Sequence, residues 1–249
     1  MRALCGWLLL LLLFAPAMAQ GEPTTLEALL ARGNSRFDEN DFVGAQADAA
    51  AALQLSPDAF DALLLMGRSL GKSGKEVEAA PYLERALAHK PEDFKALQAM
   101  AVVSFETGQT ERGAALLDKA IKLYPDKPSL YYNRGYFAYR GKERLAPEEI
   151  EAILDDFQIA QELDPTDPSA WGISGWVKWR YTTEPAGALA DLGRAIEIKP
   201  EAIDYRNRAL VYLDLKQNDN AIADLKKALE LGGDPALMKD IRDLLTTLE

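Results

Sequence analysis

An alanine recurs along this chain at an interval in the mid-thirties, and this recurrence constrains the fold more than any other feature. The alanines are Ala52, Ala86, Ala120, Ala160, Ala195 and Ala228, at spacings of 34, 34, 40, 35 and 33 residues. A proline follows each of the first five alanines five residues later, and Gly233 follows the sixth. A period of this length, carried by small residues and helix-stopping residues, predicts an array of helical repeats.

Each period contains the apolar pattern of two helices. In the second period four residues fall at i, i+3, i+4 and i+7, which is one face of a helix: Leu63, Met66, Gly67 and Leu70. Residues 71–74 break the pattern, and a second apolar face then runs from Ala79 to Pro91, where a helix must end. We expect two antiparallel helices per period, which bury their apolar faces only by stacking on their neighbours.

Small residues recur where the two helices of a period should touch. The first helices carry Gly33, Gly67, Ala101, Gly135, Gly175 and Ala209 at one site. The second helices carry Ala45, Ala79, Gly113, Ala188 and Ala221 at the facing site. Glycine within a helix costs up to about 1 kcal/mol relative to alanine. Its repeated use therefore indicates a packing constraint.

The pattern resembles the tetratricopeptide repeat. The residues that carry the resemblance are Tyr131, Gly135, Phe157, Ala160 and Pro165, and then Trp171, Gly175, Ala188, Leu192, Ala195 and Pro200. The resemblance implies an all-α, right-handed α-solenoid of six helix-turn-helix repeats, at about 25–58, 59–92, 93–126, 127–166, 167–201 and 202–233. Residues 234–249 are then a C-terminal capping helix. The family implies binding of other proteins in many unrelated systems and names no partner.

The fourth repeat departs from the others. It has about six extra residues around 139–147, which we expect to lengthen the inter-helix loop and the start of the second helix at Pro147. Ile153 replaces the expected small residue. We expect the adjacent acids Asp155 and Asp156, on the second helix, to be solvated.

Residues 1–19 have the pattern of a secretory signal peptide. Arg2 is followed by an apolar run, and Ala17-Met18-Ala19 ends it with small residues suited to cleavage before Gln20. No cysteine follows Cys5, and there is no Asn-x-Ser/Thr sequence. We therefore expect an exported protein in the periplasm, with secretion as the alternative and no membrane insertion after cleavage. The sequence leaves open the oligomeric state and whether the segment is in fact cleaved.

Charge and composition argue against several functions. The formal net charge of −11 disfavours nucleic acid as a partner, because phosphate contacts need clustered Lys and Arg. The single histidine, His89, stands near the end of a helix, where a cation suits the helix dipole. No cluster has metal-ligand spacing. The sequence thus predicts no enzyme activity, no metal and no cofactor.

First helices in the tetratricopeptide family line the concave surface of the superhelix. The groove positions lie three residues before the small residue and one, four and five after it. The candidate groove residues are Tyr132, Tyr136, Tyr139, Arg140, Trp176, Trp179, Arg180, Gln98, Phe105 and Arg206. The same positions elsewhere hold Leu64, Arg68, Lys72, Val102, Gly172 and Leu210. Leu30 and Leu65 stand where one chaperone-binding subfamily has Lys and Asn, so that ligand is not expected.

Two interpretations of the aromatics remain open. They either anchor a peptide in the groove or pack between adjacent repeats. The leading prediction is a non-catalytic adaptor in the cell envelope that binds an extended peptide or a partner helix. The alternative is a structural or assembly subunit of an envelope complex, acting through self-association, its convex face or the repeat-4 insertion.

Overall fold

The computed structural model describes residues 25–248, which form thirteen α-helices and no strand. The predicted signal peptide lies outside the described residues. The helices are α1 (Leu26–Asp38), α2 (Phe42–Leu55), α3 (Phe60–Lys72), α4 (Glu76–His89), α5 (Phe94–Glu106), α6 (Thr110–Leu123), α7 (Pro128–Tyr139), α8 (Pro147–Leu163), α9 (Pro168–Tyr181), α10 (Pro185–Ile198), α11 (Ala202–Asp214), α12 (Asn218–Leu231) and α13 (Pro235–Leu248). The all-α solenoid predicted from the sequence is confirmed.

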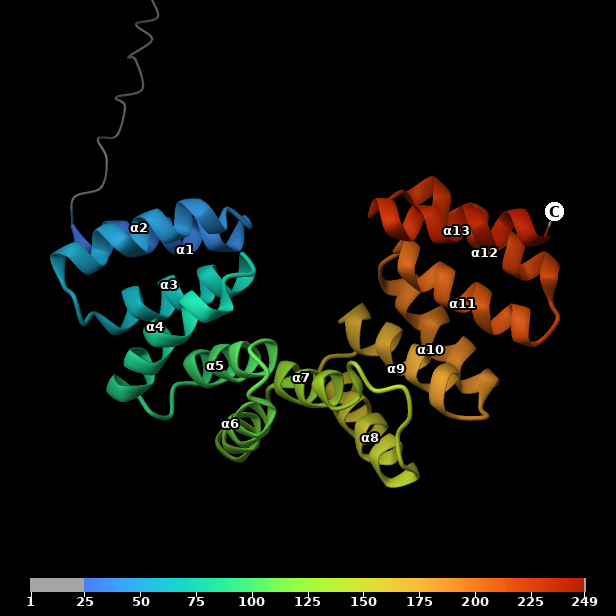
Figure 1. Ribbon diagram of the computed structural model, residues 1–249, viewed down its shortest axis with the longest axis horizontal. Helices are drawn as coiled ribbons and strands as arrows, with labels where there is room; N and C mark the ends of the chain where they lie inside the picture. The colour runs from blue at the N-terminus through green and yellow to red at the C-terminus, as the bar shows by residue number, and fades with distance from the viewer. Residues whose placement is uncertain (1–24, 249) are drawn as a thin grey trace, which may run out of the picture.

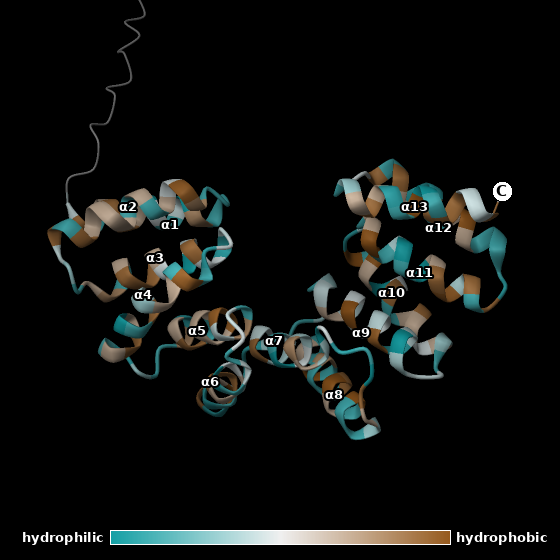
Figure 2. Cartoon of the chain, in the orientation of Figure 1, coloured by the Kyte–Doolittle hydropathy of each residue, from teal (hydrophilic) through white to brown (hydrophobic). Residues whose placement is uncertain are grey.

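Consecutive helices pair and the pairs stack into an open arch (Figure 1). The helices α1 and α2 lie at one end of the arch, and α12 and α13 lie at the other. Odd-numbered helices also contact one another, α1 with α3, α3 with α5, α5 with α7 and α9 with α11. They therefore form the inner layer of the curve, with the even-numbered helices outside. Nearly every helix carries both hydrophobic and hydrophilic residues (Figure 2), as stacking of amphipathic helices requires.

At the small-residue site of the first helix, a large side chain of the second helix packs closely against the backbone in at least two pairs. A Cβ added at Gly67 would lie 2.5 Å from Leu83 Cγ, and one at Gly175 would lie 2.7 Å from Leu192 Cγ. Leu83 and Leu192 are fully buried by this contact. Glycine is therefore needed because a large side chain of the second helix occupies the volume that a Cβ would need.

Four pairs also contain a buried aspartate, three residues after the small-residue site of the second helix. These are Asp48, Asp156, Asp191 and Asp224. Their cationic partners on the first helix are, in order, Arg36 at 2.9 Å, Arg134 at 2.7 Å, Lys178 at 2.7 Å and Arg208 at 2.8 Å. The expectation that Asp156 is solvated was therefore wrong, whereas Asp155 is exposed. Asp156 points inward because Arg134 offers it two hydrogen bonds within the pair.

In the second and third pairs, apolar side chains occupy the positions that Arg134 and Asp156 hold in the fourth pair. Met66 and Tyr82 stand there in the second pair, and Met100 and Leu116 in the third. All four belong to one core cluster or pack against it. The chain thus contains an ionic and an apolar version of the same helix contact.

The turn within a pair has a fixed backbone requirement. A residue with positive φ follows the small residue by seven positions in four repeats: Asn40 (64°), Gly74 (71°), Gly108 (77°) and Lys216 (58°). Glycine adopts this conformation without strain, and asparagine does so more readily than other residues. Lys216 is the least suited of the four.

The repeat-4 insertion forms a loop at residues 140–146 and a second helix, α8, of 17 residues. The Tyr181 hydroxyl donates a hydrogen bond of 2.6 Å to the Lys142 carbonyl, and Lys142 pairs with Glu149 at 2.7 Å. Leu145 packs against the core cluster of the repeat. The insertion is therefore tied to α8 and to the end of α9.

The last helix, α13, covers the end of the array. Its residues Met238, Ile241 and Leu245 are buried against the core of α11 and α12. Within residues 25–248, every helix is too short or too polar to span a bilayer.

The contact at Gly175 is testable with two glycines of the same repeat. We expect Gly175→Ala to destabilise the protein by about 1–3 kcal/mol, because the new methyl group overlaps Leu192 and the backbone of α10. Gly193→Ala, in α10 with its nearest neighbour at 3.9 Å, should stabilise it by up to about 1 kcal/mol. Urea denaturation measures both, and equal effects would contradict the packing explanation.

The ionic contact is testable by converting it into the apolar one. Arg208→Met alone should destabilise the protein by about 2–3 kcal/mol, because it leaves Asp224 buried without a partner. The double variant Arg208→Met/Asp224→Leu reproduces the third pair and should return to within about 1 kcal/mol of the wild type. Thermal unfolding compares the three proteins. A double variant as unstable as the single one would show that the sixth repeat needs the ion pair itself.

Candidate functional site

The inner layer of the arch contains two pockets of about 440 Å³ each. The C-terminal pocket lies between α7, α9 and α11, and its walls include Tyr139, Gly172, Trp176, Ile203, Asp204 and Asn207. The N-terminal pocket lies between α3, α5 and α7, and its walls include Arg68, Lys72, Lys95, Gln98, Val102 and Asn133. Tyr132 and Tyr136 line both pockets. The two pockets are therefore neighbouring parts of one groove with a shared wall on α7.

The shared wall is built from aromatic rings that contact one another. The rings of Tyr132 and Tyr136 stack with centroids 6.0 Å apart and planes within 7°. Tyr136 meets Tyr139 edge-on at 5.7 Å, and Tyr139 in turn contacts Trp176 at 5.3 Å. Burial raises the pKa of Tyr132 to about 12 and that of Tyr139 further, so both phenols stay neutral at physiological pH. The wall offers flat, preorganised apolar surface with hydroxyl groups at its edge.

Six of the ten candidate groove residues line the pockets. They are Tyr132, Tyr136, Tyr139, Trp176, Arg206 and Gln98. Arg68, Lys72, Val102 and Gly172, at the same repeat positions, also line them. Tyr139 contributes only an edge, because it is 8% exposed and packs in the core of its repeat against Phe157 and Val177.

The structure places the other four candidates outside the walls of both pockets. Phe105 stacks on Phe137 with centroids 4.2 Å apart, and the Trp179 indole N–H donates to Asp214 at 2.6 Å. Arg140 pairs with Glu106 and lies over the Tyr136 ring, whereas Arg180 lies over the Tyr181 ring at 5.5 Å. Leu64, at a groove position by counting, is buried in the core. These side chains turn towards partners on their own or an adjacent helix.

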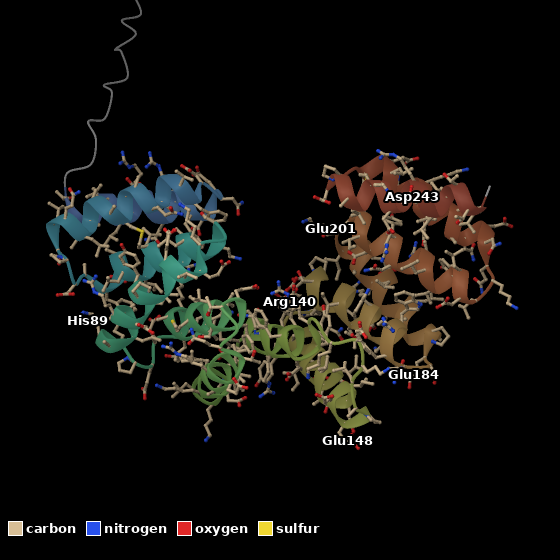
Figure 3. All side chains as sticks on the ribbon, viewed as in Figure 1. His89, Arg140, Glu148, Glu184, Glu201 and Asp243 are labelled. Carbon is tan, nitrogen blue, oxygen red and sulfur yellow. The ribbon has the colours of Figure 1, made fainter. Side chains whose placement is uncertain are left out.

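Figure 3 shows Arg140 and Glu201 on the inner edge of the arch, with Glu148 and Glu184 on its outer edge. Glu201 lines the C-terminal pocket, and its carboxylate pairs with Lys199 at 2.5 Å. Arg206 also lines this pocket, but its guanidinium bonds Asp240 of α13 at 2.8 Å. The charged groups at the rim of this pocket are thus mostly paired within the protein.

Asp204 is the functional candidate that the positional count missed. It stands five residues before Ala209, and the corresponding residues of the earlier repeats are Ala28, Ala62, Ala96, Leu130 and Ala170. The last four of these are fully or almost fully buried. Comparing the repeats at this position would have revealed Asp204, because a carboxylate replaces an apolar core residue.

The side chain of Asp204 is largely buried, and its carboxylate has no hydrogen-bond or ion-pair partner among residues 25–248. The residue is 7% exposed and lines the C-terminal pocket, with its Oδ1 2.5 Å from where a Cβ of Gly172 would lie. Burial, together with the nearby charge of Glu201, raises the pKa of Asp204 from 3.8 to about 6. An ionised carboxylate in such a place costs stability unless a ligand compensates it.

The N-terminal pocket has the opposite charge. Arg68, Lys72 and Lys95 line it, against the carboxylates of Glu76 and Glu106. Glu106 is already paired with Arg140, and the Arg68 guanidinium lies 4.2 Å above the Phe37 ring. Burial lowers the pKa of Arg68, which nevertheless stays charged at physiological pH. The groove therefore changes from basic at α3 and α5 to acidic at α11.

Three family models, each described as tetratricopeptide repeat, match residues 30–97, 70–133 and 205–232. Together they cover more than half of the chain. The chain belongs to the tetratricopeptide repeat family. Proteins of this family are generally non-enzymatic scaffolds for protein–protein interaction, so a protein partner is the general implication of the fold.

Solved structures with the same fold have low sequence identity to the chain. The APC/C hetero-tetramer Cut9–Hcn1 matches at 17% identity and TM-score 0.78, over 92% of this chain and 44% of that one. The chain thus spans less than half the length of that protein. PilF of Pseudomonas aeruginosa matches at 14% identity and a TM-score of 0.70, over 88% of this chain and 96% of that one. YrrB, described as a TPR protein with an unusual peptide-binding site, matches at 17% identity and a TM-score of 0.54. The match covers 78% of this chain and 97% of that one.

The isolation of Asp204 predicts a pH-dependent loss of stability. Because its pKa is about 6 when folded and 3.8 ordinarily, the folded protein binds the proton more tightly. Ionisation of Asp204 therefore destabilises the fold as pH rises through this interval, and the full effect is present above it. We expect Asp204→Asn to be more stable than the wild type by about 1 kcal/mol at about pH 8, with the difference vanishing towards about pH 4.

Thermal unfolding across this pH range measures the effect. Asp219→Asn, at an exposed acid in the first turn of α12, removes the same charge and serves as the control. A wild type more stable than Asp204→Asn at about pH 8 would show that the carboxylate has a stabilising partner.

Proposed function

We propose that this protein is a non-catalytic adaptor that binds an extended peptide segment of a partner protein along its concave groove. The observation that carries the proposal is the pair of adjoining pockets that share Tyr132 and Tyr136. An extended ligand that lies across these two rings places side chains in both pockets. Exposed tyrosine surface held rigidly by its neighbours binds with little loss of side-chain entropy.

Amide side chains in the groove suit a peptide backbone. Asn133 lines the N-terminal pocket, and Asn207 lines the C-terminal one. Asn207 accepts a bond from Arg206 through its Oδ1, which leaves its NH₂ group to donate elsewhere. Peptide carbonyl groups are suitable acceptors, because every residue of an extended chain presents one.

The charge gradient would fix the direction of the bound segment. Acidic side chains fit the N-terminal pocket, where Lys72 and Lys95 have no partner among the described residues. The acidic C-terminal pocket disfavours them. Electrostatic complementarity of this kind contributes more to specificity and orientation than to affinity.

We further propose that the adaptor works in the cell envelope, in the periplasm after export. The support is the pattern of residues 1–19 and the absence of cysteine after Cys5. Without cysteine the exported chain cannot form unwanted disulfides in an oxidising compartment. Fractionation with amino-terminal sequencing tests this, since a cytoplasmic protein that retains Met1 would contradict it.

The groove is testable with two tyrosine pairs. Peptides selected on the wild type from a displayed random library are measured against Tyr132→Ala/Tyr136→Ala. We expect at least about tenfold weaker binding, because both pockets lose their shared wall. The control is Tyr205→Ala/Tyr212→Ala on α11, two half-buried tyrosines outside both pockets.

Circular dichroism and sedimentation confirm that each variant stays folded. Unchanged peptide binding by the groove variant would refute the groove. Equal losses in the two double variants would assign the effect to stability instead.

A further inference from the structure

We propose that the C-terminal pocket binds the side chain of a lysine or arginine of the bound segment, with Asp204 as its counter-ion. This inference rests on the proposed function, because it names the chemistry that one of the two pockets recognises. Three independent features support it: the position of Asp204, the commitment of the neighbouring cations, and the composition of the walls.

The first feature is a charge where the repeat requires an apolar residue. The corresponding residues Ala62, Ala96 and Ala170 are buried in the contact between successive helix pairs. Asp204 is also largely buried, yet it borders the pocket and lies against Gly172, where the absence of a Cβ makes room for its Oδ1. The local fold thus leaves room for a carboxylate in the wall of the pocket.

A simpler explanation is that Asp204 complements the dipole of α11, since it stands in the first turn of that helix. An exposed acid would serve this purpose without desolvation, as Glu148 does in the first turn of α8. The dipole explains why an acid is tolerated there, but not why it is buried and faces a pocket.

The second feature is that the protein supplies no cation to Asp204. The other buried aspartates Asp48, Asp156, Asp191 and Asp224 each have an arginine or lysine of their own helix pair. The cations near Asp204 have other partners, since Arg206 bonds Asp240 and Lys199 bonds Glu201. The carboxylate is therefore left for a cation from outside the described chain.

The third feature is the composition of the other walls of the C-terminal pocket. Tyr132, Tyr136 and Trp176 provide aromatic surface, and Ile203 and Pro168 provide aliphatic surface. Lysine and arginine combine a long apolar stem with a terminal cation, so they match a largely apolar pocket with a carboxylate in its wall. Aromatic rings also attract a cation through their negative faces. A negatively charged or short polar side chain would gain neither contact.

The experiment uses the purified protein and a random peptide library displayed on phage. We expect the enriched peptides to share one basic position. For a synthetic peptide from this set, replacing the basic residue by norleucine, which keeps the apolar stem, should weaken binding at least about tenfold. With Asp204→Asn, the lysine and norleucine peptides should bind about equally. Asp219→Asn should keep the full preference, although it changes the net charge by the same amount.

Unfolding would not explain a lost preference for lysine in Asp204→Asn, because this variant is expected to be more stable than the wild type. Peptides that bind through the groove without a shared basic residue would overturn this inference and leave the proposed function standing. A preference for lysine that survives in Asp204→Asn would also overturn it. A library from which the wild type enriches nothing would overturn the proposed function together with this inference.

Discussion

The structure depends on the close approach of two helices at one small residue in each repeat. At Gly67 and Gly175 a leucine of the second helix occupies the volume of the missing side chain, so the two axes can approach. A glycine or an alanine stands at this site in every repeat, and its regular recurrence favours regular stacking of the pairs. The inner layer of odd-numbered helices, and with it the groove, follows from this one constraint.

The treatment of buried charge separates the scaffold from the candidate site. Four buried aspartates are neutralised within their own helix pair, and two repeats replace the ion pair by apolar side chains. Both arrangements avoid an unpaired charge in the interior of the protein. Asp204 follows neither, because it is buried at the wall of a pocket whose lining cation, Arg206, is bonded to Asp240 instead. A carboxylate placed in this way supports the proposal that a cationic ligand completes the site.

The groove was predictable from the sequence in part. Counting from the small residue predicts Tyr132, Tyr136 and Trp176 as groove residues, and all three line the C-terminal pocket, because helix geometry fixes the direction in which each Cα–Cβ bond points. Counting could not decide where a long side chain goes from there. Phe105 and Trp179 turn to Phe137 and Asp214 on the neighbouring first helix. Such choices depend on rotamers and on neighbours from another repeat, which a count within one helix does not contain.

The sequence by itself determined the helices, their pairing and the positions that must be small. These properties arise from local periodicity and from steric limits that recur in each repeat. Only the tertiary structure decided which charges are paired. Asp156 finds Arg134 across its helix pair, whereas Asp204 meets the backbone of Gly172 and the edge of a pocket. Two aspartates on helices of the same array thus have opposite surroundings, and the energy of a buried charge is set by the groups that surround it in space.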